Sequence, residues 1–204
     1  MNRSLRSTVL FVVLVSVLSI PVFSQGVGVP KISGFIPNYG QWPEEVRYVL
    51  PNDNLNVWVT QTGIVFDQFS VEDAKRTGHV LRLTWTDANV LEQSYSKDVY
   101  DNTNVNIFTG ASPGGWRNNM GLARSITFPN AWSGVDLVLY VDGANRFRYD
   151  FKVKPNADAK RIGFRVAGDQ GMRISSDAVA LKTSVGEVHF DNCRDPIHIK
   201  YTLR

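Results

Sequence analysis

Alternation of apolar and polar residues with a period of two is the feature that most constrains this chain. Residues 135–141 and 147–153 both alternate in this way, and Asp142 and Gly143 follow the first segment. Successive side chains of a strand point to opposite faces, and Asp-Gly readily adopts the positive φ angles of tight hairpin turns. The pattern predicts an antiparallel hairpin with one apolar face, formed by Phe147, Tyr149, Phe151 and Val153.

Similar short segments recur along the chain and are separated by residues that favour turns. No segment shows a sustained helical period, whereas short strands at such spacing are typical of antiparallel sandwiches. The sequence therefore predicts an all-β fold, an antiparallel β-sandwich-like single domain, with irregular structure at 71–78 and 86–104. The other expected strands are 46–50, 55–59, 64–69, 79–85, 105–109, 123–128, 161–167, 172–174, 178–182 and 187–190.

The N-terminus has the order of regions found in a secretory signal peptide. Arg3 and Arg6 precede an apolar run at 8–20, and Pro21 ends that run. The run is too short for a comfortable transmembrane helix, so we expect a signal peptide at 1–24, cleaved after Ser24. The alternative is an uncleaved anchor. The sequence then predicts export to the periplasm, the cell surface or the medium, with no membrane span after cleavage.

Four segments follow from these patterns: a signal peptide at 1–24, a flexible lead-in at 25–34, a β domain at 35–190, and a divergent tail or final edge strand at 191–204. The formal net charge is +3, and removing Arg3 and Arg6 leaves +1 (3 − 2), which gives no sign of a nucleic-acid or membrane-surface partner. With Cys193 as the single cysteine, a disulfide within the chain is impossible. We expect this thiol to be buried and inert; pairing with another chain is the alternative.

The chain shows no catalytic constellation. His79, His189 and His198 lack zinc-site spacing, and no nucleophile elbow or phosphate-binding loop occurs. Glu44 and Glu45 are adjacent, whereas a glycosidase needs two carboxyl groups on opposite sides of its substrate.

Two oxygen-rich stretches have the donor type that calcium prefers, although neither has the order of an EF-hand loop. The first contains Asp98, Asp101, Asn102 and Asn104, and the second contains Asp142, Asn145 and Asp150. We expect ordinary turn chemistry, no resident cofactor, and calcium only as an alternative.

Five tryptophans are the remaining feature. Trp58 and Trp85 lie in alternating segments, and we expect them in the core. Trp42, Trp116 and Trp132 lie in segments rich in Gly, Pro and Asn, and we expect them to plug the ends of the sandwich. The alternative is that they cluster at one end and form a ligand platform.

Several strings resemble one family. They include Asn38-Tyr39-Gly40-Gln41-Trp42, the segment 62–66, the block 106–119, the strand 132–140, the string 149–158 and the segment 181–188. In order and spacing they resemble the uncharacterised N-terminal β domain (DUF7948-like) of bacterial secreted proteins that carry SBBP, or β-propeller-like, repeats. The resemblance covers about residues 35–190 and implies a Bacteroidetes-like exported protein with downstream modules. Here residues 191–204 replace the usual continuation; a truncated gene, a fragment and a single-domain variant are the alternatives.

The function expected from these observations is a non-catalytic structural or interaction module of a secreted or cell-surface protein, normally N-terminal to repeat domains. Its expected partners are those downstream modules, or a cell-surface protein or glycan. The alternative is a carbohydrate-binding module that uses the loop tryptophans. An enzyme would instead show two opposed carboxylates in a cleft, or a histidine within hydrogen-bond reach of a serine.

Overall fold

The computed structural model describes residues 34–89, 95–108, 116–144, 146–175 and 178–191, with side chains omitted for 95–103 and 191. All of them belong to the unit 31–204. In this part of the chain the structure has strands and one short 3₁₀ turn, Ala159–Arg161, and no helix long and apolar enough to span a membrane. The strands are β1 (Ile36–Pro37), β2 (Val46–Leu50), β3 (Leu55–Thr60), β4 (Gly63–Glu72), β5 (Lys75–Thr86), β6 (Tyr95–Phe108), β7 (Trp116–Trp132), β8 (Val135–Val141), β9 (Phe147–Val153), β10 (Gly163–Ala167), β11 (Met172–Ile174), β12 (Ala178–Thr183) and β13 (Gly186–Asp191).

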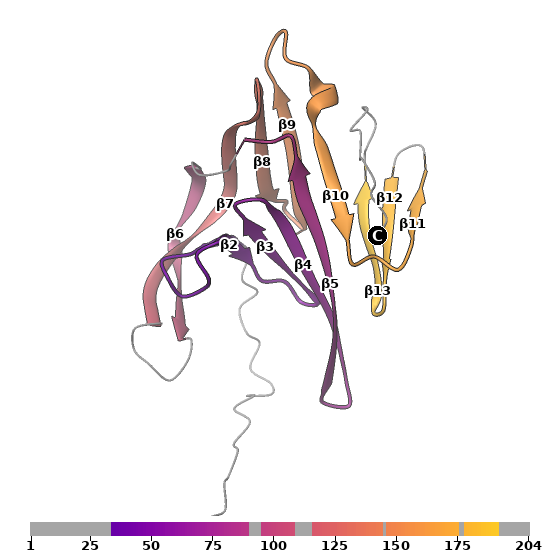
Figure 1. Ribbon diagram of the computed structural model, residues 1–204. Coiled ribbons are helices and arrows are strands. Elements are labelled where there is room, and N and C mark those ends of the chain that lie inside the picture. Colours follow the sequence, from indigo (N-terminus) through magenta and orange to yellow (C-terminus); the bar gives the residue numbers. More distant parts are fainter. Residues whose placement is uncertain (1–33, 90–94, 109–115, 145, 176–177, 192–204) are drawn as a thin grey trace, which may run out of the picture. The chain divides into compact units, whose positions relative to one another are not determined.

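These strands form three antiparallel sheets, which confirms the predicted all-β, sandwich-like class. A six-stranded sheet has the order β1-β2-β3-β4-β5-β10, a four-stranded sheet the order β6-β7-β8-β9, and a three-stranded sheet the order β11-β12-β13 (Figure 1). The two larger sheets are joined near the N-terminus. The backbone of Phe35, just before β1, exchanges two hydrogen bonds with Ala123 of β7, at N···O distances of 2.8 and 3.0 Å.

The predicted pairing of the hairpin at 135–153 is confirmed, but Asp142 and Gly143 do not have the positive φ angles expected of a tight Asp-Gly turn, and the Asp142 N–H instead donates to the Arg146 carbonyl oxygen at 3.0 Å. β8 pairs with β9 in continuous register from Val135↔Val153 to Val141↔Phe147. Phe147, Tyr149 and Phe151 all pack against the core, whereas Val153, at the end of the strand, is 44% exposed.

Three segments differ from the sequence prediction. Residues 71–78, expected as a loop, continue the pairing of β4 with β5 around Asp73 and Ala74, whose φ angles are 50° and 61°. Positive φ at both central residues gives a turn whose twist matches that of the flanking strands. Much of 86–104, expected to be irregular, belongs to β6. β7 continues past Pro129, where the register with β8 shifts in a bulge that tolerates proline.

The apolar core lies where the three sheets meet. Trp132 of β7 is 1% exposed, and its indole ring packs edge-on against Trp85 of β5, Phe151 of β9 and Phe164 of β10. Its Nε1 donates a hydrogen bond to the carbonyl oxygen of Thr86 at 2.9 Å. One buried side chain therefore contacts strands of both larger sheets.

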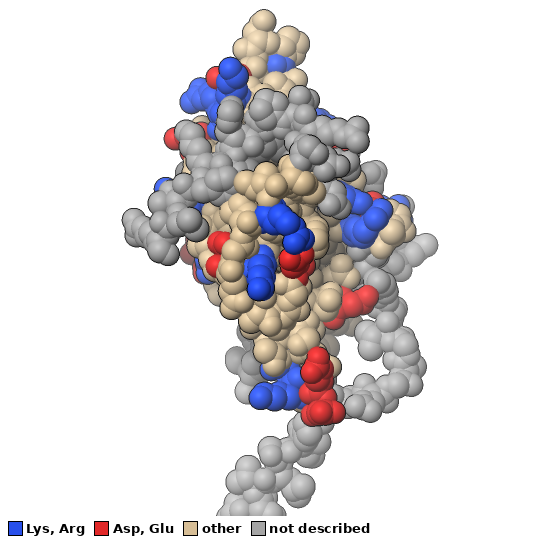
Figure 2. Space-filling model, turned by 90° about the vertical axis from the view of Figure 1, so that its right-hand side faces the viewer, with Lys and Arg blue, Asp and Glu red and all other residues tan. Residues whose placement is uncertain are grey.

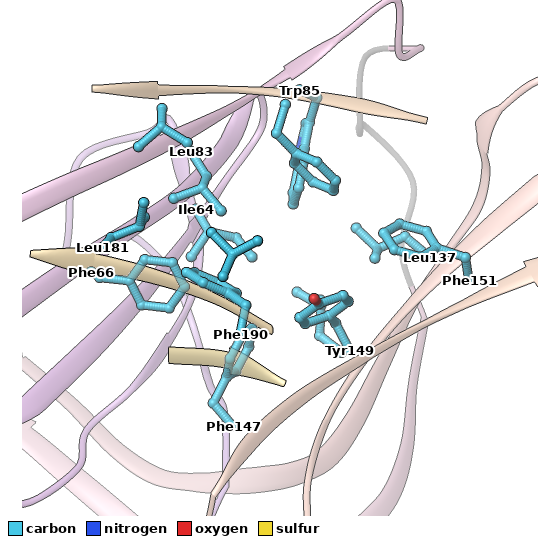
Figure 3. A pocket seen from close by; sticks show the side chains of 14 residues that line it. Ile64, Phe66, Leu83, Trp85, Leu137, Phe147, Tyr149, Phe151, Leu181 and Phe190 are labelled. Carbon is cyan, nitrogen blue, oxygen red and sulfur yellow. The ribbon is translucent and has the colours of Figure 1, made fainter. Parts of the chain in front are cut away.

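The three-stranded sheet closes the same core. Leu181 of β12 and Phe190 of β13 line an apolar space together with residues of β4, β5, β8, β9 and β10 (Figure 3). The Phe190 ring packs against Phe66 and Tyr149, with centroid distances of 5.7 and 6.3 Å. The small sheet is thus held by apolar contacts to both larger sheets.

Candidate interaction surface

Asn38 organises the loop that carries the Asn-Tyr-Gly-Gln-Trp string. Its Nδ2 donates hydrogen bonds to the carbonyl oxygens of Trp42, Pro43 and Val46 at 2.9–3.1 Å. Its Oδ1 accepts hydrogen bonds from the backbone N–H groups of Gly40 and Trp42 at 3.0 and 3.2 Å. One amide side chain thus contacts five backbone groups: Oδ1 accepts from two N–H groups, and the two Nδ2 hydrogens are shared among three carbonyl oxygens.

Gly40 and Gln41 complete the loop from within. Gly40 has a φ angle of +97°, a backbone conformation that residues with a Cβ atom rarely adopt. Gln41 is buried; its Nε2 donates a hydrogen bond to the Pro37 carbonyl oxygen, and its Oε1 accepts one from the Tyr39 N–H. The segment 38–42 is therefore a compact unit that fixes the backbone from which Tyr39 and Trp42 project.

Trp42 and Arg117 attach this loop to the two larger sheets. The Trp42 ring packs edge-on against Trp58 of β3, with a centroid distance of 5.9 Å. Arg117 of β7 donates one hydrogen bond from Nε to the Tyr39 carbonyl oxygen and another from Nη1 to the Trp116 carbonyl oxygen, both at 2.8 Å. The guanidinium group thus ties the loop to the start of β7.

The exposed aromatic side chains lie on the Asn38 loop and at one end of the β6–β7 hairpin. Among the described side chains, the aromatic ones classed as exposed are Tyr39 (61%), Phe108 (62%) and Trp116 (42%). Phe108 and Trp116 face each other across β6 and β7, with ring centroids 5.5 Å apart and planes at 89°. We call Phe108 and Trp116 the aromatic surface. Their rings lie on the opposite face of the hairpin from Trp42, since Trp42 packs in one cluster with Ile107 and adjacent residues of a strand point to opposite faces.

The structure does not bring the three predicted platform residues together. Trp116 is exposed and Trp42 is partly buried, but Trp132 is enclosed by the core and cannot contact a ligand at the surface. Its neighbours Pro129 and Gly134 suggested a loop, whereas Trp132 ends a strand that turns inward. The tryptophan pattern did not predict that Tyr39 and Phe108 are exposed, although Gly40 follows Tyr39 directly and Gly110 lies two residues after Phe108, and glycine at these places is typical of a turn.

The apolar space in the core is a second candidate site. It is lined by aromatic and aliphatic side chains, which include Trp85, Phe147, Tyr149 and Phe190 (Figure 3). Its volume is about 40 Å³, whereas pockets for organic ligands typically measure ~300–1,000 Å³. We therefore interpret it as a packing void of the core rather than a ligand site.

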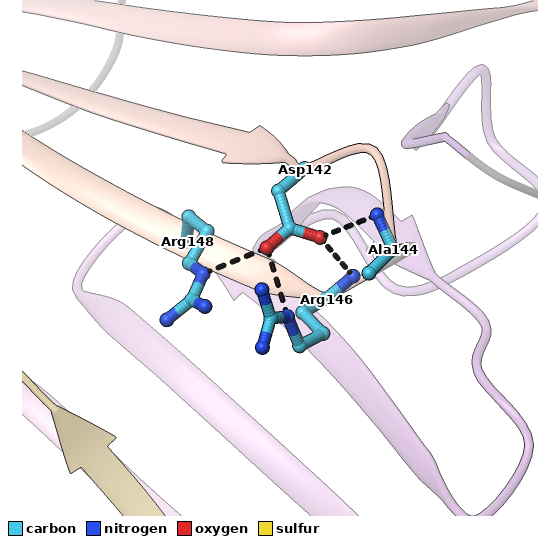
Figure 4. Close-up of polar contacts among 4 residues, drawn as sticks. All are labelled: Asp142, Ala144, Arg146 and Arg148. Carbon is cyan, nitrogen blue, oxygen red and sulfur yellow. Dashed lines mark hydrogen bonds and ion pairs between the residues drawn. The ribbon is translucent and has the colours of Figure 1, made fainter.

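Asp142 begins the β8–β9 turn, and its carboxylate is saturated by donors (Figure 4). Oδ1 accepts from the N–H groups of Ala144 and Arg146 at 3.0 and 2.9 Å, and Oδ2 accepts from Nε of Arg146 and Arg148 at 2.9 and 3.0 Å. The Arg146 backbone hydrogen bond is the largest of the causes that hold the pKa of Asp142 well below its usual range. Its oxygens are thus already occupied within the turn, which removes them from a calcium site at this loop.

Tyr140 and Asp150 form a second polar contact on the same hairpin. Burial, followed by the charge of Asp150 and a hydrogen bond to it, raises the pKa of the Tyr140 phenol. Of the other expected calcium ligands, Asn145 and the side chains of Asp98, Asp101 and Asn102 lie outside the described residues. Within the described ranges, no three His, Cys, Asp or Glu side chains are grouped as metal ligands.

His79 lies within hydrogen-bond reach of Ser184, the kind of contact that would favour an enzyme. Ser184 Oγ is 3.0 Å from His79 Nδ1, and the Ser184 backbone N–H donates to the same nitrogen at 3.1 Å. Nε2 bonds to the carbonyl oxygen of Gly168. Since a carbonyl only accepts and an N–H only donates, the neutral tautomer protonated at Nε2 fits both partners.

This arrangement fits a structural clamp better than a nucleophilic pair. A general base needs its lone pair for the serine proton, but the Ser184 backbone N–H already engages the Nδ1 lone pair. Nε2 faces a carbonyl rather than a carboxylate, and neither residue lines the apolar space. Next to Ser184, the Thr183 hydroxyl donates a hydrogen bond to Gln68 Oε1 at 2.8 Å. The His79–Ser184 and Gln68–Thr183 contacts therefore join the end of β12 and the β12–β13 turn to β5 and β4.

The remaining sequence candidates lie apart from one another. Glu44 and Glu45 are exposed in the turn that follows Trp42. His189 of β13 lies 3.2 Å from Glu187 of the same strand. His198 and Cys193 lie outside the described residues.

The family model for "Domain of unknown function (DUF7948)" matches residues 35–193. The chain belongs to this family. No curated protein and no solved structure matches it significantly. The family match begins at Phe35, the residue that joins the two larger sheets, and covers every described strand.

We predict that Asn38→Ala lowers the free energy of unfolding by about 2–3 kcal/mol, because it leaves five backbone groups of the loop without their partner. Asn118→Ala, at an exposed position of β7, is the control and should stay within about 0.5 kcal/mol of the wild type. Urea unfolding measures both values. A loss below about 0.5 kcal/mol in Asn38→Ala would show that the loop does not depend on this side chain.

A second prediction concerns pH. The folded-state pKa of Asp142 is lowered, so its contribution to stability is present at neutral pH and is lost as the pH falls below the unfolded value of about 4. Asp142→Asn keeps an acceptor for the backbone but removes the charge that pairs with Arg146 and Arg148. Thermal melts should therefore show a lower Tm for the variant at pH 7 and a narrowing gap toward pH 2. A difference in Tm between the wild type and Asp142→Asn that stays constant from pH 7 to pH 2 would contradict the lowered pKa of Asp142.

Proposed function

We propose that this chain is a non-catalytic interaction module of an exported bacterial protein, and that the aromatic surface is where it contacts its partner. The observation that carries the proposal is the cross-strand pair of exposed aromatic rings at one end of the β6–β7 hairpin. Phe108 and Trp116 are held there by the pairing of β6 with β7, with their ring centroids 5.5 Å apart. Exposed apolar groups gathered in this way mark interaction sites on soluble proteins.

The strand pairing supports this proposal because it holds the two rings in a fixed arrangement. A rigid aromatic side chain has few rotatable bonds to order on binding, so little conformational entropy is lost. The neighbouring Arg117 directs its Nε and Nη1 at backbone carbonyl oxygens rather than at a reacting centre. The His79–Ser184 contact, on other strands, likewise supports a structural role.

Export is supported by the N-terminal sequence. Two arginines, an apolar run and a proline precede Ser24 in the order of a signal peptide. The family resemblance adds the expectation that the domain stands ahead of repeat modules in secreted or cell-surface proteins.

The overall charge gives no sign of a nucleic-acid partner, since the formal net charge is +3, or +1 without Arg3 and Arg6. On the face presented in Figure 2, basic and acidic side chains lie interspersed among uncharged ones. A nucleic-acid surface instead needs a continuous basic patch to displace counterions from phosphates.

The test is fractionation of a bacterial host that expresses the full chain with its own N-terminus. We predict an exported product that begins at Gln25 and is retained at the outer cell surface. The double variant Phe108→Ala/Trp116→Ala should be exported with an unchanged Tm but recovered mainly in the medium. The matched control Val71→Ala/Ile174→Ala, at positions 61% and 57% exposed, should behave as the wild type.

Two results would contradict the proposal separately. An intact Met1 in the membrane fraction would contradict export. Equal retention of the double variant and the wild type would contradict the role of the aromatic surface.

A further inference from the structure

Two edge strands meet at one side of the apolar core. Among the described strands, β9 is the last of the four-stranded sheet and β13 is the last of the three-stranded sheet. Phe190 of β13 packs against Tyr149 of β9 with ring centroids 6.3 Å apart, so these strands are neighbours. The outer edge of such a strand is a row of backbone N–H and C=O groups with which a further strand can pair.

The side chains at this place are apolar and incompletely buried. Phe147, Tyr149 and Phe151 of β9 line the apolar space together with Phe190 of β13 (Figure 3). These four rings are only partly buried, whereas most of the other lining side chains are buried. An apolar segment laid beside them would remove further apolar surface from water.

The sequence that follows β13 has the alternation of a half-buried strand. Residues 192–204 lie outside the described residues. From 197 to 203, apolar and polar residues alternate without a break, which puts the apolar ones on one face of a strand. The apolar residues are Ile197, Ile199, Tyr201 and Leu203, and the polar ones are His198, Lys200 and Thr202. Pro196 stands directly before them, at the start of a strand, where a missing N–H is tolerated.

The two faces of β13 restrict how such a strand can pair with it. Val188 is buried, and the Phe190 ring packs against the core. Glu187 and His189, which alternate with them, are exposed. An added strand must therefore place its apolar residues opposite Val188 and Phe190, because paired residues of neighbouring strands share a face of the sheet.

A connection of four residues, 192–195, brings the two apolar faces together. In an antiparallel hairpin with this connection, Ile197 lies opposite Phe190. Ile199 then lies opposite Val188. A connection one residue longer or shorter would turn both isoleucines to the solvent face, since side chains alternate along a strand. Hairpin loops of four residues are common in proteins.

The same register also agrees in charge. It places Lys200 opposite Glu187 on the exposed face of the sheet. Glu187 Oε2 accepts a hydrogen bond from Arg173 Nη2 at 3.0 Å and lies 3.2 Å from His189 Nε2. A carboxylate directly across from a lysine is a favourable cross-strand pair, whereas like charges in these positions repel each other.

We propose that the outer edge of β13 is a docking site for the chain's own segment 196–203, which pairs with β13 in this register and covers the partly buried rings of β9 and β13. The segment is tethered to β13 by four residues, so its effective concentration at this edge exceeds that of a separate molecule. Of the two expectations for 191–204, this is the final edge strand. The inference is independent of the function proposed for the aromatic surface.

Disulfide trapping in the full chain tests the register. Cys193→Ser removes the natural thiol, and the pair Glu187→Cys/Lys200→Cys is then oxidised in dilute solution. Directly opposite residues are within disulfide distance, so an intrachain disulfide should form, seen as a change in migration on a non-reducing gel. The matched control is Glu187→Cys/Thr202→Cys. Its second cysteine lies on the same face but two residues out of register, and it should oxidise at least about tenfold more slowly.

Three outcomes of the trapping experiment would overturn the proposal. Equal oxidation rates in the two cysteine pairs would show that the segment is not held in this register. The absence of a disulfide in both pairs would show that it does not lie beside β13. Disulfide-linked dimers in place of the intrachain product would assign the edge of β13 to a second copy of the chain.

Thermal melts of the full chain test the packing of the segment. Ile199→Asp places a charge on the face that points to the core, so it should lower the Tm by at least about 4 °C. Thr202→Asp, on the opposite face, is the control and should change the Tm by no more than about 1 °C. Equal Tm values for Ile199→Asp and the wild type would overturn the proposed contact with the core.

Discussion

The packing of Trp132 in the apolar core is the interaction on which the rest of this structure depends. The indole ring belongs to the four-stranded sheet, packs against Trp85 and Phe164 of the six-stranded sheet, and bonds to the Thr86 carbonyl oxygen. A chain with one cysteine cannot form a disulfide within itself, so apolar contacts of this kind must hold the sheets together. The three-stranded sheet joins the same core through Phe190 and Leu181.

Aromatic side chains are enclosed in the core but exposed at the aromatic surface. In the core, rings meet edge to face in a closed cluster that leaves only a small void. At the surface, Phe108 and Trp116 meet in the same geometry but remain exposed. The difference arises from the backbone: β7 runs from the surface at Trp116 to the core at Trp132, so one long strand couples the proposed site to the packed interior.

The sequence predicted those strands for which the alternation of apolar residues and the flanking turn residues indicate the same structure. The hairpin at 135–153 combines alternation with a strong turn signal, and its strands pair as predicted. Residues 71–78 are exposed on both faces, so the pairing of their strands left no alternation to detect. Trp132 was misplaced because Gly134 and Pro129 suggested a loop, whereas a bulge admits the proline. The five hydrogen bonds of Asn38 depend on how backbone groups converge in space, which residue types alone do not specify.

The most direct test of the shared core is hydrogen exchange of the wild type and of Trp132→Ala. Removing this ring should lower the free energy of unfolding by about 3–5 kcal/mol, because the cavity it leaves is enclosed by both larger sheets. Since all three sheets share one core, amide protection should fall by a similar free energy in β5, β8, β10 and β12 together. A loss confined to β7 and β8, with unchanged protection in the other two sheets, would contradict the account.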